Sequence, residues 1–127
     1  MSFESTLYAY LSGYTGLTAL ISTKIYPDNV PQDTAPPYIF YQEVYRQKMY
    51  THNGYNGTSE WSIQISSFAT TRASVRAIAD QVSSAMDGWS AVNSKVGYVE
   101  QENERSLWIE DLGLYTIDQD YLIFYKD

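Results

Sequence analysis

Apolar and polar positions alternate along residues 70–89 with the period of an α-helix. The apolar side chains recur three or four residues apart: Val75, Ile78, Ala79, Val82, Ala85 and Met86. Polar side chains fill most positions between them, so one face of the segment is apolar and the other is not. The pattern predicts a long amphipathic helix over residues 71–87. Its apolar stripe needs a surface to cover, and the strand-like flanking segments suggest a sheet.

Both ends of this predicted helix carry a sequence signal. Thr70 or Thr71 offers a side-chain oxygen that can accept a hydrogen bond from the free N–H groups of the first turn. Gly88 stands where a left-handed C-terminal cap would form. We therefore expect the helix to end there, with Trp89 folding back onto its last turn.

The N-terminal segment predicts a helix that is interrupted once. An apolar stripe that includes Phe3, Leu7 and Leu11 runs through its first part. Gly13 and Gly16 then interrupt the pattern, and a short second helical stretch follows. We expect a broken helix at this end of the chain.

Five segments predict β-strands because they are rich in β-branched and aromatic residues or alternate between apolar and polar side chains. In chain order they are residues 24–28, 38–46, 60–69, 95–104 and 113–126. No repeat or linker divides the chain, so residues 1–127 predict a single α+β domain. We expect an antiparallel or mixed sheet of about four to five strands with the broken helix and the long amphipathic helix packed on it.

The segment over residues 47–58 is polar and contains two dipeptides typical of tight turns, Asn53-Gly54 and Asn56-Gly57. It predicts an exposed hairpin tip or a long arm. The candidate contact residues in and beside it are Tyr45, Lys48, Met49, Tyr50, His52 and Tyr55. Aromatic, basic and flexible side chains of this kind are enriched at protein interfaces, although an ordinary solvated hairpin is the alternative.

Charge and composition narrow the possible functions. The net charge of −7 argues against a protein that grips nucleic acid, which needs clustered basic residues. Thirteen tyrosines favour contacts with other proteins, although tyrosine also simply favours strands. Cysteine is absent, which excludes disulfides and thiolate chemistry. No apolar run approaches the roughly 20 residues of a membrane span, and no signal peptide is evident, so we expect a cytoplasmic protein.

The sequence offers little support for catalysis. His52 is the single histidine and has no neighbour at a spacing that would orient it as a base, so we expect no enzyme and no cofactor. Glu100, Glu102 and Glu104 alternate and would share one face of a strand. They could hold a hard cation, but a solvated acidic edge that discourages edge-to-edge pairing is favoured, and we assign no metal.

The order of several short motifs resembles one known family. LTALIST is followed by KIYPD, a proline-bearing connection, PPYIFYQ, a helix ending in MDGW, and a closing GLY before an alternating strand. This order, over nearly the whole chain, is similar to that of the tail-completion proteins of long-tailed bacteriophages, also called tail terminators or head-to-tail joining proteins. The segment over residues 47–58 is longer and richer in tyrosine than the family's polar loop.

The resemblance implies a structural virion protein that forms a ring, of six copies, on the last turn of the tail tube. Its partners would be further copies of itself, the tail tube protein and a head-side connector protein, with DNA passing nearby without specific binding. It would assemble in the host cytoplasm and remain in the virion at the head–tail junction. Another head–tail connector, such as a head-closure or neck protein, is the alternative, and a small metal-dependent enzyme is a weaker one.

Two sets of residues become candidate sites on this basis. The segment around residues 47–58 would contact a partner during assembly. The acidic residues Glu100, Glu102 and Glu104 would face the ring channel, where like-charge repulsion would let DNA slide through.

Overall fold

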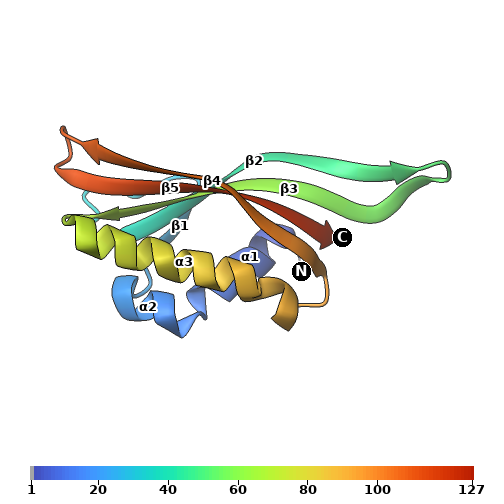
Figure 1. Ribbon diagram of the computed structural model, residues 1–127, viewed down its shortest axis with the longest axis horizontal. Helices are drawn as coiled ribbons and strands as arrows, with labels where there is room; N and C mark the ends of the chain where they lie inside the picture. Colours follow the sequence, from blue (N-terminus) through green and yellow to red (C-terminus); the bar gives the residue numbers. More distant parts are fainter. Residues whose placement is uncertain (1) are drawn as a thin grey trace.

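The computed structural model describes residues 2–127, which form three helices and one five-stranded mixed sheet (Figure 1). The elements are α1 (Phe3–Ser12), α2 (Thr15–Ile21), β1 (Ile25–Pro27), β2 (Tyr38–Thr51), β3 (Gly54–Ala69), α3 (Arg72–Val92), β4 (Val96–Ile109) and β5 (Leu114–Lys126). The helices lie together on one face of the sheet, which gives two layers. The predicted α+β domain, with a broken N-terminal helix and a mixed sheet, is confirmed.

The strands follow the order β1-β2-β3-β5-β4. β1 pairs with β2 in parallel, and every other neighbouring pair is antiparallel. β2–β3 and β4–β5 are hairpins of consecutive strands, and α3 carries the chain from the first hairpin to the far edge of the sheet. The two edges are therefore the short strand β1 and the long strand β4.

α3 is longer than the sequence suggests. It begins after Thr71, whose side chain accepts a hydrogen bond from the Ser74 backbone N–H at 3.1 Å, as expected for an N-cap. It then continues to Val92, so the predicted end at Gly88 is wrong. Trp89 continues the apolar stripe and is almost fully buried. Burial of this large ring outweighs the roughly 1 kcal/mol that glycine costs inside a helix.

The core lies between the helices and the sheet and is rich in stacked aromatic rings. Phe3 of α1 stacks on Trp61 of β3 with ring centroids 4.3 Å apart. Tyr10 stacks on Trp89 of α3 at 5.3 Å and donates a hydrogen bond to the Ala85 carbonyl at 2.6 Å. These contacts attach α1 to the sheet and to α3.

The other face of the sheet carries no helix in residues 2–127 (Figure 1). A polar row crosses it from Gln42 of β2 through Gln64 of β3 and Asp120 of β5 to Arg105 of β4, with successive contacts of 2.9, 3.2 and 3.1 Å. Each of these polar side chains thus has a hydrogen-bond partner on the neighbouring strand. The centre of this open face is therefore polar.

Three strands extend beyond their predicted ends. β2 runs on to Thr51 and β3 begins at Gly54, so most of the segment predicted as a polar tip is regular hairpin. β4 extends to Ile109. In each case the added residues pair with a neighbouring strand, and that pairing overrides their polar or mixed composition.

Candidate functional site: a projecting arm and an acidic strand

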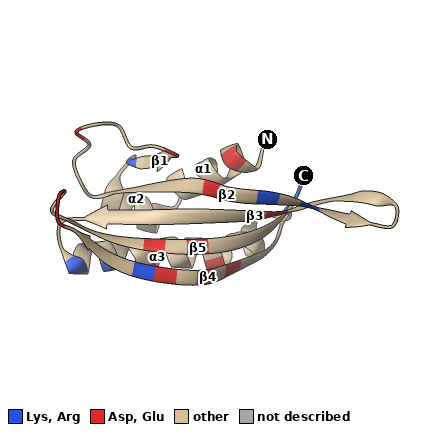
Figure 2. Ribbon diagram, turned by 90° about the horizontal axis from the view of Figure 1, so that it is seen from above, with Lys and Arg blue, Asp and Glu red and all other residues tan. Residues whose placement is uncertain are grey.

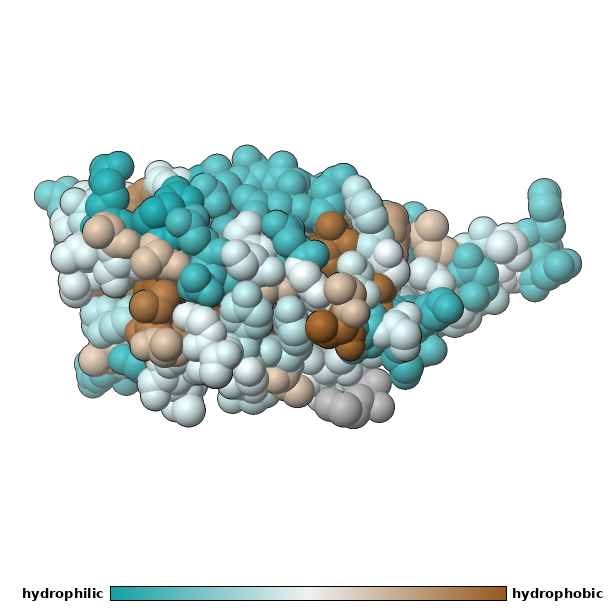
Figure 3. Space-filling model, turned by 60° about the horizontal axis from the view of Figure 1, so that its bottom comes forward, coloured by the Kyte–Doolittle hydropathy of each residue, from teal (hydrophilic) through white to brown (hydrophobic). Residues whose placement is uncertain are grey.

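The outer part of the β2–β3 hairpin, residues 45–58, forms what we call the arm. It extends past the helices and the other strands at one end of the molecule (Figures 1 and 3). His52 and Asn53 lie between the two strands, and Gly54 follows with φ of 103°. Such positive φ values are strained for residues with a side chain, so glycine at this position sets the tight turn. The predicted hairpin is confirmed.

Two irregularities shape the arm. Val44 is an extra residue on β2, and its side chain is exposed at the point where the arm leaves the body. Gly57, with φ of 85°, lies in β3 where the register shifts a second time. The Asn56-Gly57 dipeptide is therefore a bulge within a strand, and its interpretation as a second turn is wrong. Bulges of this kind increase the local twist and re-aim the side chains beyond them.

Three of the six candidate contact residues, Lys48, Tyr50 and Tyr55, lie close together on the arm. Tyr50 is the most exposed of the aromatic residues, at 67%. Its ring centroid lies 6.0 Å from that of Tyr55, and the Lys48 ammonium lies 5.1 Å above the Tyr55 ring. His52 is exposed in the turn, and Met49 is also exposed. The arm thus presents an aromatic and basic surface to solvent.

The arm is fixed at its root by Asp127, which follows β5. Asp127 accepts a hydrogen bond from Ser59 at 2.5 Å, pairs with Arg46 at 3.0 Å, and also bonds to the Tyr55 hydroxyl. The Arg46 guanidinium lies 5.1 Å from the centroid of the Trp61 ring. This cluster ties the arm to the core through charge-assisted and cation–π contacts. This cluster could not be predicted from the sequence, because no sequence pattern links position 127 to positions 46 and 59.

The acidic residues of β4 do not share one face, so that expectation is wrong. A bulge separates Gln101 from Asn103, and Glu102 falls on it. Glu100 is paired with Leu122, whereas Glu104 is paired with the buried Gln119 on the helix side of the sheet. One extra residue reverses the alternation, which a count of two-residue spacing cannot anticipate.

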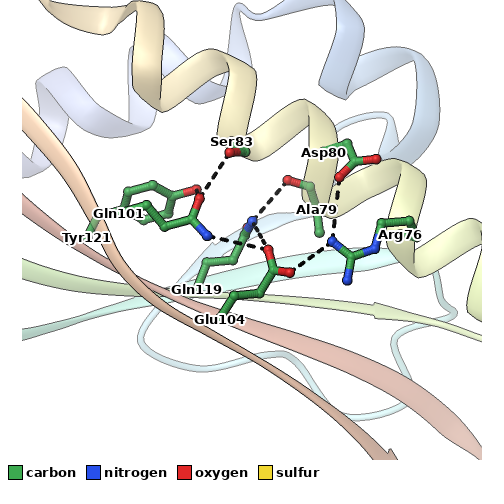
Figure 4. Close-up of polar contacts among 8 residues, drawn as sticks. All are labelled: Arg76, Ala79, Asp80, Ser83, Gln101, Glu104, Gln119 and Tyr121. Atoms are coloured by element: carbon green, nitrogen blue, oxygen red, sulfur yellow. Dashed lines mark hydrogen bonds and ion pairs between the residues drawn. The ribbon is translucent and has the colours of Figure 1, made fainter.

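Glu104 belongs to a polar network between α3 and the sheet (Figure 4). Its carboxylate pairs with Arg76 of α3 at 2.9 Å and accepts a hydrogen bond from Gln119 at 3.0 Å. Gln119 also donates to the Ala79 carbonyl at 3.1 Å. Burial acts to raise the pKa of Glu104, but the hydrogen bonds from Arg76 and Gln119 and the Arg76 charge outweigh it and hold the pKa below its usual range.

We expect Glu104→Gln to weaken the dependence of the free energy of unfolding on pH in the acid range. Because the pKa of Glu104 is lower in the folded state, its ionised carboxylate stabilises the fold above the unfolded pKa of about 4.3. That stabilisation is lost as the pH falls through the folded pKa. The variant should be about 1 kcal/mol less stable at pH 7 and should approach the parent at pH 3. Urea unfolding across this range checks the result. Glu102→Gln, on the exposed bulge, is the control, and equal profiles for both variants would contradict the assignment.

Further acidic residues lie on β5, the strand that pairs with β4 (Figure 2). Asp120 and Asp118 of β5 lie 3.1 and 3.7 Å from the Arg105 guanidinium, and Asp118 accepts a hydrogen bond from Ser66 at 2.7 Å. Arg105 therefore forms ion pairs with both carboxylates. Glu100 and Glu102 contribute further negative charge to this side of the molecule.

Within residues 2–127, no three His, Cys, Asp or Glu side chains gather closely enough to hold a metal ion. None of the described helices combines the length and apolar character needed to cross a membrane. His52, the one imidazole of the chain, lies at the tip of the arm.

Exposed aromatic side chains such as those on the arm are enriched at the hot spots of protein–protein interfaces. Comparison with protein families makes this specific, because the family model described as "Tail completion protein gp17" matches residues 5–126. The chain therefore belongs to this family of phage tail completion proteins. The family comprises structural virion proteins and is not an enzyme family.

A solved structure has the same fold. A chain in "Virion of native gene transfer agent (GTA) particle" superposes with a TM-score of 0.80 at 18% sequence identity, over 99% of this chain and 96% of that chain. At this identity the likeness concerns the fold alone. The comparison with curated proteins gives no match.

Proposed function

We propose that this protein caps the end of the phage tail tube as a ring, six copies in number, and joins the tail to the DNA-filled head. Membership of the tail completion family supports the role. The observation that carries it in this chain is the arm, whose exposed aromatic side chains are anchored at their root by Asp127 and Arg46. Its partners are further copies, the tail tube protein and a head-side connector.

The arm is better suited to binding than to holding the fold. Its outer side chains, such as Tyr50 and Met49, lie outside the apolar core between the helices and the sheet. A two-stranded hairpin without a covered face is marginally stable by itself, so the ordered conformation of the arm depends on the contacts at its root. Fixing the arm before assembly lowers the entropy cost of binding a partner.

Joining of separated particles tests this function. Filled heads and free tails are mixed with the purified protein, and joined particles are counted by electron microscopy. We expect the number of joined particles to rise in proportion to the protein added. Equal joining with and without the protein would contradict it.

We also propose that Glu100 and Glu102 face the ring channel and keep DNA from sticking to its wall. Glu104 is not included, because its carboxylate is engaged by Arg76 on the helix side of the sheet. A channel wall of one negative sign repels phosphate, so DNA passes without being held. The surplus of carboxylates on β4 and β5 supports this placement.

Charge reversal at these two positions is the corresponding prediction. Glu100→Lys with Glu102→Lys should slow DNA ejection several-fold while leaving the ring assembled, because each new cation attracts phosphate. Ejection is followed by dye fluorescence after receptor is added. Asp80→Lys with Asp87→Lys, both at exposed positions of α3, adds the same four positive charges away from β4. Ejection unchanged in both double variants would remove the channel assignment.

A further inference from the structure

The arm carries an unusual charge for this chain. Residues 45–58 contain Arg46, Lys48 and His52 but no aspartate or glutamate, although the whole protein has a net charge of −7. Arg46 is already paired at the root, which leaves Lys48 as the cation nearest the exposed tyrosines. The surface that receives the arm should therefore combine carboxylates with apolar groups.

The opposite end of the molecule has this character. The turn between β4 and β5 carries Glu110 and Asp111 and no basic residue. Beside them lie three large exposed apolar side chains, Leu107 at 52%, Trp108 at 53% and Leu112 at 60%. Exposed apolar groups clustered beside acidic ones mark an interaction surface rather than ordinary solvent exposure.

A groove adjoins this turn and can take an aromatic side chain. It has a volume of about 630 Å³ and is lined by Arg72, Val75 and Arg76 of α3 together with Trp108 and Tyr115. The Arg72 guanidinium already lies 5.6 Å from the centroid of the Tyr115 ring, so a further ring entering the groove would meet both a cation and an aromatic face. The space is enough for one or two tyrosine rings.

The two surfaces lie at opposite ends of the long axis (Figure 1). A chain that carries both halves of a complementary pair at opposite ends can associate head to tail with further copies. Such a heterologous contact repeats from copy to copy and closes into a ring when its rotation permits. A two-fold contact between two arms would instead bring their Lys48 ammonium groups together.

We infer that the arm of one copy docks on the β4–β5 end of the next. Tyr50 enters the groove beside Trp108, and Lys48 pairs with Glu110 and Asp111. This inference rests on the proposed ring and names the contact that builds it. The arm then binds a second copy of this chain, in preference to the tail tube.

The absence of cysteine from the sequence allows a direct test by disulfide cross-linking. A tagged Y50C chain is mixed with an untagged W108C chain, alone and on tail tubes, and mildly oxidised. A covalent tagged–untagged pair is expected. V92C, at an exposed position near the end of α3, replaces W108C as the control and should give no such pair.

A charge swap supplies the second measurement. Lys48→Glu should weaken self-association at least tenfold by sedimentation, and adding Glu110→Lys and Asp111→Lys should restore it. Lys95→Glu changes the net charge equally and should have no effect.

Two outcomes would overturn the inference in distinguishable ways. In the first, rings assemble, but no Y50C–W108C cross-link forms and Lys48→Glu does not affect assembly. That result would leave the proposed function standing but would place the arm elsewhere, for example on the tail tube. A chain that stays monomeric both alone and on tail tubes would remove the contact and the proposed ring together.

Discussion

Replacing Trp89 by alanine is expected to destabilise the fold by about 3–5 kcal/mol, the usual cost of deleting a buried indole. Trp89 is 1% exposed and stacks on Tyr10, while its ring lies 5.9 Å from that of Phe3. The substitution therefore opens a cavity where α1 meets α3. Urea unfolding at pH 7, monitored by circular dichroism, measures the change.

Val92→Ala is the matched control on the same helix. Val92 is 72% exposed, so its loss should alter stability by no more than about 0.5 kcal/mol. A loss below about 1 kcal/mol for Trp89→Ala would contradict the assignment of this residue to the core.

Shortening the arm is expected to abolish assembly while sparing the fold. Because Lys48 and Ser59 are paired, replacing residues 49–58 by Asn-Gly closes the hairpin with a two-residue turn. The root contacts of Asp127 with Arg46 and Ser59 remain possible. The purified variant should unfold within about 1 kcal/mol of the parent, yet phage carrying it should lose infectivity by orders of magnitude, since hot-spot aromatic residues are removed. Plaque counts and unfolding curves give the two readouts.

Asn53→Asp controls for a change within the arm itself. Asp-Gly favours the same kind of tight turn as Asn-Gly, so arm length and shape are kept and infectivity should be retained. Wild-type infectivity from the shortened variant would show that the arm is dispensable for assembly.

Local patterns in the sequence predict the main elements well. The stripe from Val75 to Met86 identifies α3 because helical spacing depends only on neighbours a few residues away. The end of that helix was predicted wrongly, because the burial of Trp89 under α1 depends on contacts with a segment distant in sequence. A glycine cap signal at position 88 cannot report on such packing.

The candidate site is less accessible to sequence reasoning for the same reason. The exposed tyrosines of the arm follow from composition and turn signals, but the root formed by Asp127, Arg46 and Ser59 joins positions far apart in the chain. The grouping of Glu104 with Glu100 failed because a bulge inserts one residue and reverses the faces beyond it. Bulges arise from pairing between strands, and no pairing is visible in the acidic segment alone.

Electron microscopy of lysates from a phage lacking this gene is the most direct test of a role in tail completion. We expect DNA-filled heads lying beside detached tails, some of them overlong, because neither joining nor termination of the tube takes place. Heads that fail to retain DNA would instead assign the protein to a head-side connector. Normally joined particles would contradict a role in tail completion.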